Sequence, residues 1–130
     1  MIVLDTHIWV WWVDGNARLT TRQLELIQRY APEGLGVSII SCWEVAKLVE
    51  VGRLVLSYPV QDWIAQALAY PNVQLLNLTP EIAVVSTQLL GAFHRDPADQ
   101  LIVATARVYD CPLLTADERI LSYASVKTLT

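Results

Sequence analysis

Short apolar runs that alternate with helical patterns along the whole chain constrain its fold more than any other feature. Strands are expected at residues 2–5, 35–39, 73–76 and 112–115, with a brief extended piece at 54–56 and an edge strand at 126–129. Helices are expected at residues 7–13, 21–30, 41–51, 60–70, 79–90, 96–109 and 118–123. Such alternation is typical of a mostly parallel sheet with helices on both faces. The sequence therefore predicts an α/β/α sandwich with four or five strands.

The length and composition favour one domain with a large apolar core. A chain of 130 residues, 54% hydrophobic and only 17% charged, is long enough to bury such a core and is not typical of a disordered chain. We therefore expect residues 1–130 to form a single domain, with apolar surface left over for a partner. The longest apolar run covers residues 8–13, far short of the roughly 20 that a membrane helix needs. The N-terminus has no signal-peptide pattern, so a cytoplasmic protein without a membrane segment is expected.

Four acidic residues stand where a sheet of this kind binds ligands. Asp5 and Asp117 follow two of the apolar runs, and Glu44 and Asp99 lie in the first turns of two predicted helices. Ligands of open α/β sheets bind beyond the carboxyl ends of the strands. Carboxylate oxygens are the ligands that Mg²⁺ and Mn²⁺ prefer. The sequence therefore predicts that these four acids form one metal site.

Helix capping offers an alternative explanation for each of these acids taken singly. Ser41 and Glu44 have the Ser-x-x-Glu spacing of a capping box. Asp96 is the expected N-cap of the helix in which Asp99 occupies the first turn, where a carboxylate complements the helix dipole. Asp5 and Asp117 each precede a predicted helix, as N-caps do. The local sequence leaves both interpretations open.

Hydroxyl side chains flank the acids and can support them through hydrogen bonds. These candidates are Thr6, Ser38, Ser41 and Thr115. The two histidines, His7 and His94, lack the spacing of a ligand pair. No Ser or Cys comes with an identifiable base, and no glycine-rich phosphate loop is present, so nucleophilic catalysis and nucleotide binding through such a loop are not indicated.

The remaining distinctive residues favour structural roles. Cys42 and Cys111 form neither a metal-binding pair nor a disulfide framework, and we expect both to be small buried side chains. The tryptophans follow helical segments and are assigned to the core or to a partner surface rather than to base stacking; they are Trp9, Trp11, Trp12, Trp43 and Trp63.

The net charge of −4 first argues against a nucleic-acid partner. If four of the 13 acids hold metal, nine remain against nine Lys and Arg residues. Divalent ions would then make the site itself electropositive. The charge therefore does not exclude RNA.

Four segments, taken in order, resemble PIN domains. They are residues 3–9 with Asp5-Thr6-His7, residues 38–44 ending in Glu44, residues 94–106 containing Asp99, and residues 114–117 ending in Asp117. The chain is most similar to the VapC-type toxins of prokaryotic type II toxin–antitoxin systems. The likeness covers essentially the whole chain. Each motif is short, but the ordered set is specific.

This resemblance implies a Rossmann-like sheet and an endoribonuclease that depends on Mg²⁺ or Mn²⁺ and hydrolyses RNA. Asp5, Glu44 and Asp99 match the three central acids of the family site, Asp117 matches a more variable fourth acid, and Thr115 matches a hydroxyl beside it. Gln100 stands where the family usually has Arg, which puts a phosphate or partner contact there in doubt. The resemblance also implies a homodimer and a cognate antitoxin that covers the acidic pocket. The variable stretch at residues 52–72 is the expected determinant of RNA specificity.

Two other functions compete with this one. An aspartyl-phosphate site on Asp5 would need a second acid two residues on and a later lysine, but residue 7 is His and no lysine falls between Lys47 and Lys127. A PIN fold that works only as a binding module would have lost one or more acids, and all four are present. The residues therefore favour the nuclease.

Overall fold

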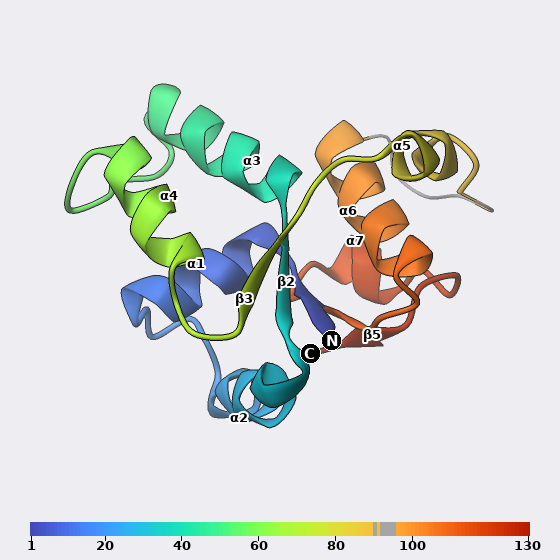
Figure 1. The fold of residues 1–130 in the computed structure, drawn as a ribbon, viewed down its shortest axis with the longest axis horizontal. Helices are drawn as coiled ribbons and strands as arrows, with labels where there is room; N and C mark the ends of the chain where they lie inside the picture. The colour runs from blue at the N-terminus through green and yellow to red at the C-terminus, as the bar shows by residue number, and fades with distance from the viewer. Residues whose placement is uncertain (90, 92–95) are drawn as a thin grey trace.

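The computed structural model describes residues 1–89, 91 and 96–130. In this part of the chain five parallel strands form one sheet in the order β3-β2-β1-β4-β5 (Figure 1). The strands are β1 (Ile2–Leu4), β2 (Leu35–Ser38), β3 (Val73–Leu76), β4 (Leu113–Leu114) and β5 (Thr128–Leu129). Val3 of the central strand pairs with Gly36 on one side and Leu113 on the other. The prediction of a mostly parallel sheet is confirmed, and the described sheet is parallel throughout.

The helices that the structure describes follow the predicted order. They are α1 (Thr6–Asp14), α2 (Thr21–Tyr30), α3 (Ile39–Glu50), α4 (Val60–Leu68), α5 (Pro80–Ser86), α6 (Pro97–Val108) and α7 (Glu118–Leu121), with a 3-10 turn, η1 (Ala31–Glu33). Local capping explains several of these boundaries. Thr20 and Gln23 form the capping box that starts α2, and Gly15, with a φ of 62°, ends α1 in the left-handed conformation that glycine adopts without strain.

Several boundaries differ from the predictions by a few residues, and the start of α3 differs for an identifiable reason. Helix α3 begins at Ile39 rather than at residue 41, because the Ser38 side chain accepts a hydrogen bond from the Ile40 amide at 3.1 Å and acts as the N-cap. The predicted capping box between Ser41 and Glu44 is therefore wrong. Helix α5 ends at Ser86, so its predicted extension is wrong over residues 87–89, and residue 90 lies outside the described residues.

The extended piece predicted at residues 54–56 is not a strand. The Leu54 amide donates to the Leu48 carbonyl at 3.2 Å, which ties this segment to the end of α3 instead of to the sheet. Leu54 and Leu56 pack against the hydrophobic core, which accounts for their apolar character.

Each face of the sheet is covered by helices. In Figure 1, α1, α3 and α4 lie on the left of the strands and α5, α6 and α7 on the right. The residues that the structure describes form two hydrophobic cores. In the first, Trp9 of α1 and Trp63 of α4 are fully buried, and their rings pack edge to face with the ring centroids 5.1 Å apart. The second core joins Val3 to Ile102 of α6 and Ile120 of α7. Each such buried large side chain contributes about 1.5–3 kcal/mol to folding.

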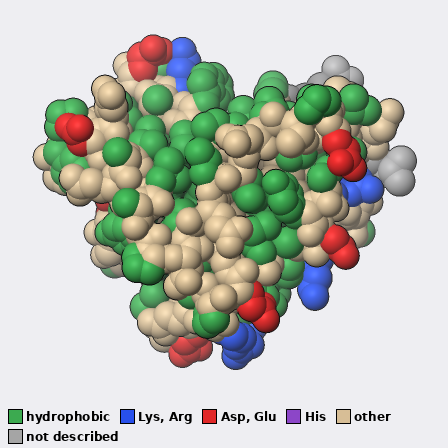
Figure 2. Space-filling model, viewed as in Figure 1, with side chains coloured by type: hydrophobic (Ala, Val, Ile, Leu, Met, Phe, Trp, Pro, Cys, Tyr) green, Lys and Arg blue, Asp and Glu red, His purple; other side chains and the backbone are tan. Residues whose placement is uncertain are grey.

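Several apolar side chains remain at the surface. Figure 2 shows hydrophobic and uncharged side chains across the middle of the face viewed in Figure 1, with charged groups near its edge. Trp43 is 56% exposed, whereas Trp11 and Trp12 are half-buried. Cys42 and Cys111 are also only half-buried, so the expectation of two fully buried cysteines is wrong. No helix in the described ranges is long and apolar enough to span a membrane.

Candidate acidic metal centre

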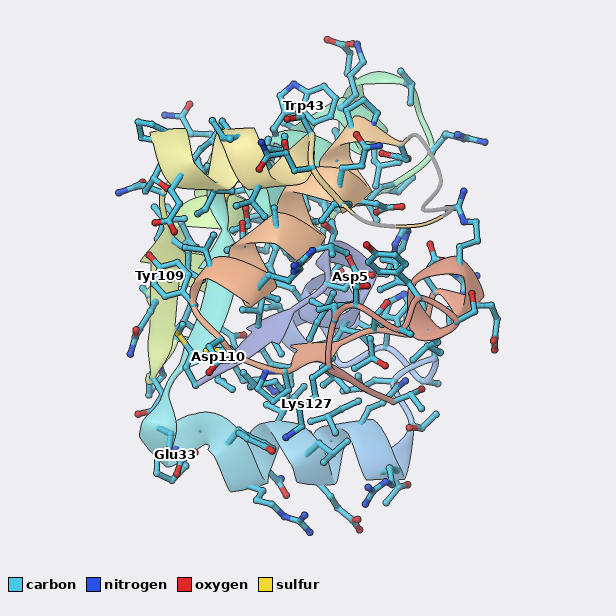
Figure 3. All side chains as sticks on the ribbon, turned by 90° about the vertical axis from the view of Figure 1, so that its right-hand side faces the viewer. Asp5, Glu33, Trp43, Tyr109, Asp110 and Lys127 are labelled. Carbon is cyan, nitrogen blue, oxygen red and sulfur yellow. The ribbon has the colours of Figure 1, made fainter. Side chains whose placement is uncertain are left out.

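The four predicted acids come from four different elements at the carboxyl edge of the sheet. Asp5 ends β1 and is the N-cap of α1, and Asp117 follows β4 and is the N-cap of α7. Glu44 lies in the second turn of α3, and Asp99 lies in the first turn of α6. Figure 3 shows Asp5 beyond the end of the central strand, between α6 and the C-terminal segment. The parallel sheet is what brings these distant segments to one edge.

Asp5 is buried, with a residual exposure of 6%. Its Oδ1 accepts a hydrogen bond from the Thr6 amide at 2.9 Å, and its Oδ2 accepts one from the Thr115 hydroxyl at 2.7 Å. Burial raises the pKa of this carboxyl, although the hydrogen bond from Thr115 opposes that shift. Thr115 also accepts from the Asp117 amide at 3.0 Å, so one hydroxyl orients residues of two strand ends.

Glu44 is connected to the same edge through Thr6. The Thr6 hydroxyl lies 2.5 Å from Glu44 Oε1, to which it donates, and 2.9 Å from the Ser41 hydroxyl, which is fully buried. Burial raises the pKa of Glu44, and the neighbouring carboxylate of Asp5 adds to that shift. Thr6 therefore contacts Asp5 through its backbone and Glu44 through its side chain.

Asp99 is a third acid with a raised pKa. Only 7% of this residue is exposed, and burial raises its pKa to about 8. The carboxylates of Asp5, Asp96, Glu44 and Asp117 contribute to the same shift, in that order. Negative charges without a compensating cation favour the protonated form of a neighbour. The pKa of Asp99 thus shows that the acids interact as one group.

Asp117 is both a helix cap and a member of this group. Its Oδ1 accepts from the Arg119 amide at 2.9 Å, and its Oδ2 lies 3.0 Å from the Arg119 guanidinium. The same guanidinium nitrogen lies 3.6 Å from Asp99 Oδ2. Arg119 was not identified from the sequence; the signal available there was a basic residue two positions after a predicted N-cap.

The donor set fits a hard divalent cation, although the acids do not converge on one point. Among the described residues, no three His, Cys, Asp or Glu side chains are close enough together to hold an ion by themselves. Burial raises the pKa of Asp99 to about 8, and the neighbouring carboxylates are near enough to add to that shift. Mg²⁺ usually keeps several waters and takes only one or two carboxylates directly. An open group of four acids is compatible with that preference.

Other predicted residues lie in different positions relative to the acids. Ser38 caps α3, and no hydrogen bond from it to one of the four acids is found among the described residues. Asp96 is the N-cap of α6, as predicted. Gln100, in the first turn of α6, is half-buried. His94 lies outside the described residues.

A cavity of about 330 Å³ opens beside the acids. Its lining residues are Asp5, His7, Trp11, Arg18, Ala116 and Asp117. A cavity of this volume is at the lower end of the range for ligand sites. It gives a ligand access to two of the four carboxylates.

The parallel sheet and the acids at its carboxyl edge define an α/β protein with a candidate acidic metal centre. The family model of the PIN domain matches residues 2–126. The chain belongs to the PIN domain family, and the resemblance seen in its motifs is confirmed.

The similarity to known proteins extends over the whole chain. The sequence is 35% identical over 129 residues to Ribonuclease VapC22 of Mycobacterium tuberculosis, which covers 99% of this chain and 96% of that protein. The fold matches VapBC2 from Rickettsia felis, solved bound to a promoter DNA fragment, with a TM-score of 0.71, 15% identity and 99% and 98% of the two chains covered. It also matches FitAcB from Neisseria gonorrhoeae, with a TM-score of 0.70, 20% identity and coverage of 100% and 97%.

Proposed function

We propose that this chain is an endoribonuclease that depends on Mg²⁺ or Mn²⁺ and is the toxin of a VapBC-type toxin–antitoxin pair. The observation that carries the proposal is the group of four carboxylates at the sheet edge, in which Asp5 and Asp99 are buried and burial with the neighbouring charges raises the pKa of Asp99 to about 8. Without a bound cation, the clustered carboxylates of a metal centre repel one another, and a divalent ion would relieve that repulsion. The 35% identity to a protein named as a ribonuclease supports the same activity.

The metal-binding residues of the proposed site are Asp5, Glu44, Asp99 and Asp117. A bound divalent ion supplies positive charge for the scissile phosphate and lowers the pKa of a water molecule. Asp5 and Asp99, the two most buried acids of the four, are the proposed direct ligands. Glu44 is a ligand or positions the attacking water, and Asp117 acts through water or at a second ion.

Three hydroxyl residues hold these acids in place in the proposed mechanism. Thr115 fixes Asp5 Oδ2 by its 2.7 Å hydrogen bond, and Thr6 fixes Glu44 Oε1. Ser41 in turn contacts the Thr6 hydroxyl at 2.9 Å. Hydrogen bonds of this kind reduce the rotation of carboxylates that must stay aligned during the reaction. Thr6, Ser41 and Thr115 are therefore positioning residues.

We propose an antitoxin and a second copy of this chain as its protein partners. The matched structures from Rickettsia felis and Salmonella typhimurium are VapBC bound to DNA, and a matched structure from Klebsiella pneumoniae is a toxin–antitoxin complex. Exposed apolar side chains, including Trp43, Leu75 and Val84, provide surface for such contacts. Residues 1–130 act in this proposal as one cytoplasmic domain.

Cleavage of total cellular RNA by the purified chain tests the activity. The reaction is run in Mg²⁺ or Mn²⁺. Addition of EDTA and the Asp99→Asn variant are the two controls in which cleavage is expected to be lost. Asp110→Asn is the matched control, because it removes the same charge from an exposed residue at the end of α6 distant from the acids (Figure 3). The proposal expects metal-dependent cutting that Asp110→Asn keeps and Asp99→Asn loses.

The chemistry of the product ends adds a second criterion. Hydrolysis by water leaves a 5′-phosphate and a 3′-hydroxyl. A 2′,3′-cyclic phosphate would show that the RNA's own 2′-hydroxyl is the nucleophile and would contradict the proposed route. A folded, antitoxin-free protein that neither cuts RNA nor binds Mn²⁺ would instead indicate a PIN fold that serves as a binding module.

A further inference from the structure

Two cavities beside α1 share three of their lining residues. The first is the cavity of about 330 Å³ that reaches Asp5 and Asp117. The second, also about 330 Å³, lies between α1 and the end of α3. Both are lined by His7, Trp11 and Arg18. The two cavities are therefore neighbours along α1.

The second cavity has a mixed lining that suits a nucleotide. Val10, Leu48 and Leu54 supply apolar contacts, and Asn16, Arg18 and Arg53 supply polar ones. Trp11 is half-buried, with its ring centroid 6.0 Å from that of the exposed His7. Single-stranded RNA is commonly bound by aromatic side chains that stack on its bases and by cations that contact its phosphates. Both kinds of group are present here.

The two arginines of this cavity have no acidic partner. Within the residues that the structure describes, neither Arg18 nor Arg53 forms an ion pair, whereas Lys47 pairs with Glu50 and Arg119 with Asp117. Both arginines are exposed. In a chain with only nine Lys and Arg residues, two unpaired cations at one cavity provide charge complementary to phosphate.

Hydrogen bonds of the backbone amides fix the two loops that carry these arginines. The Arg18 amide donates to the Asn16 side chain at 2.8 Å, and the Asn16 amide donates to the Trp11 carbonyl at 2.9 Å. The Arg53 amide donates to the Leu48 carbonyl at 2.9 Å, directly after α3. These two loops are therefore hydrogen-bonded to α1 and α3, and less conformational entropy is lost when a ligand binds.

From this geometry we propose that the two cavities form an RNA-binding groove, which we call the α1 groove. In it, Arg18 and Arg53 contact backbone phosphates, and Trp11 with His7 supports a base next to the nucleotide that is cut. The inference rests on the proposed nuclease function and adds the path of the substrate. It revises the assignment of Trp11 to the core or a partner surface, and it places Arg53, from the predicted specificity stretch, in direct contact with RNA.

Binding of a short fluorescein-labelled RNA of mixed sequence, measured by fluorescence anisotropy, tests the α1 groove. Every protein carries Asp99→Asn, so that the probe stays intact. On this background Arg18→Ala and Arg53→Ala are compared with Arg22→Ala, which removes the same charge from an exposed residue of α2 that lines neither cavity. Each groove variant is expected to weaken binding about tenfold, as loss of a charge-assisted hydrogen bond does.

The salt dependence separates a phosphate contact from a structural effect. For single-stranded RNA, each lost phosphate contact lowers the slope of log Kd against log salt by about 0.7. Arg18→Lys and Arg53→Lys should keep the wild-type slope, whereas the alanine variants should not. A fold defect would weaken RNA binding in the lysine variants as well as in the alanine variants.

The outcomes distinguish this inference from the proposed function. If the native chain cuts RNA but Arg18→Ala and Arg53→Ala bind the probe like Arg22→Ala, the groove assignment is wrong and the nuclease stands. That result would favour a protein as the occupant of the groove. If RNA binds through both arginines but no cutting occurs in Mg²⁺ or Mn²⁺, the groove stands and the nuclease does not.

Discussion

The Thr115 hydroxyl donates a hydrogen bond of 2.7 Å to Asp5 Oδ2, although 110 positions separate the two residues in the sequence. The contact exists because β1 and β4 are parallel neighbours and end at the same edge of the sheet. It also links two acids, since Thr115 accepts from the Asp117 amide. Removal of this hydroxyl is therefore a test of the acidic centre that leaves every carboxylate in place.

Thr115→Val is expected to lower Mn²⁺ affinity about 10- to 100-fold, which is the usual cost of losing a partner that orients a metal ligand. Isothermal titration with Mn²⁺ measures the effect. The matched control is Thr105→Val, because Thr105 is equally buried but donates to the Leu101 carbonyl within α6. Equal Mn²⁺ affinities for the two variants would show that Thr115 serves the fold alone.

Asp5→Asn is expected to leave the metal-free protein at least as stable as the wild type while it abolishes cleavage. Burial disfavours the charged form of Asp5. The asparagine amide oxygen can still accept from the Thr6 amide, and its amide nitrogen can donate to the Thr115 hydroxyl oxygen. Thermal melts with and without Mn²⁺ measure the effect. The wild type should gain stability from Mn²⁺ and the variant should gain much less. A large fall in the melting temperature of metal-free Asp5→Asn would favour a purely structural cap.

Stability of the metal-free protein should fall as the pH rises from about 4 to about 8. The pKa of Asp99 is about 8 in the fold, against an ordinary value of 3.8. Between these values the unfolded chain has lost the proton that the folded chain keeps, so the free energy of unfolding decreases with pH. Below this window both states are protonated, and above it both are ionised. The raised pKa values of Asp5 and Glu44 act in the same direction.

Urea denaturation at a series of pH values measures this dependence. Asp99→Asn should flatten it, and Asp110→Asn should leave it as in the wild type. Saturating Mn²⁺ should reduce it as well, because a cation compensates the ionised carboxylates. A wild-type stability that increases steadily from pH 4 to 8 would contradict the burial and mutual repulsion of these acids.

Arg119→Ala is expected to tighten Mn²⁺ binding severalfold. The guanidinium lies 3.0 Å from Asp117 Oδ2 and 3.6 Å from Asp99 Oδ2, so it competes with a metal ion for the same carboxylates. Titration at low and high salt measures the effect, which should be smaller at high salt because Arg119 is exposed. Arg29→Ala on α2 is the control for loss of charge. Weaker Mn²⁺ binding in Arg119→Ala would assign this residue to the support of Asp117 instead.

The sequence by itself determined the order of the elements and the identity of the acids. Hydrophobic periodicity and helix capping depend on residues a few positions apart, which is why the N-cap at Asp96 was found where it was predicted. The four ordered motifs were sufficient to indicate the PIN family, which the family match at residues 2–126 confirms. The choice between metal ligands and helix caps stayed open, because both interpretations predict the same residues.

Tertiary structure decided which of these residues meet. Asp5 and Asp117 cap helices and also belong to the group that raises the pKa of Asp99, so helix capping does not exclude their place in the proposed metal site. The contact of Arg119 with Asp99, the hydrogen bond from Thr115 to Asp5 and the shared cavity of Arg18 and Arg53 follow from strand order and helix packing. Such contacts join segments tens of residues apart, and their geometry depends on the whole sheet. Local sequence preferences do not encode that geometry, so only the folded chain could define the centre and its groove.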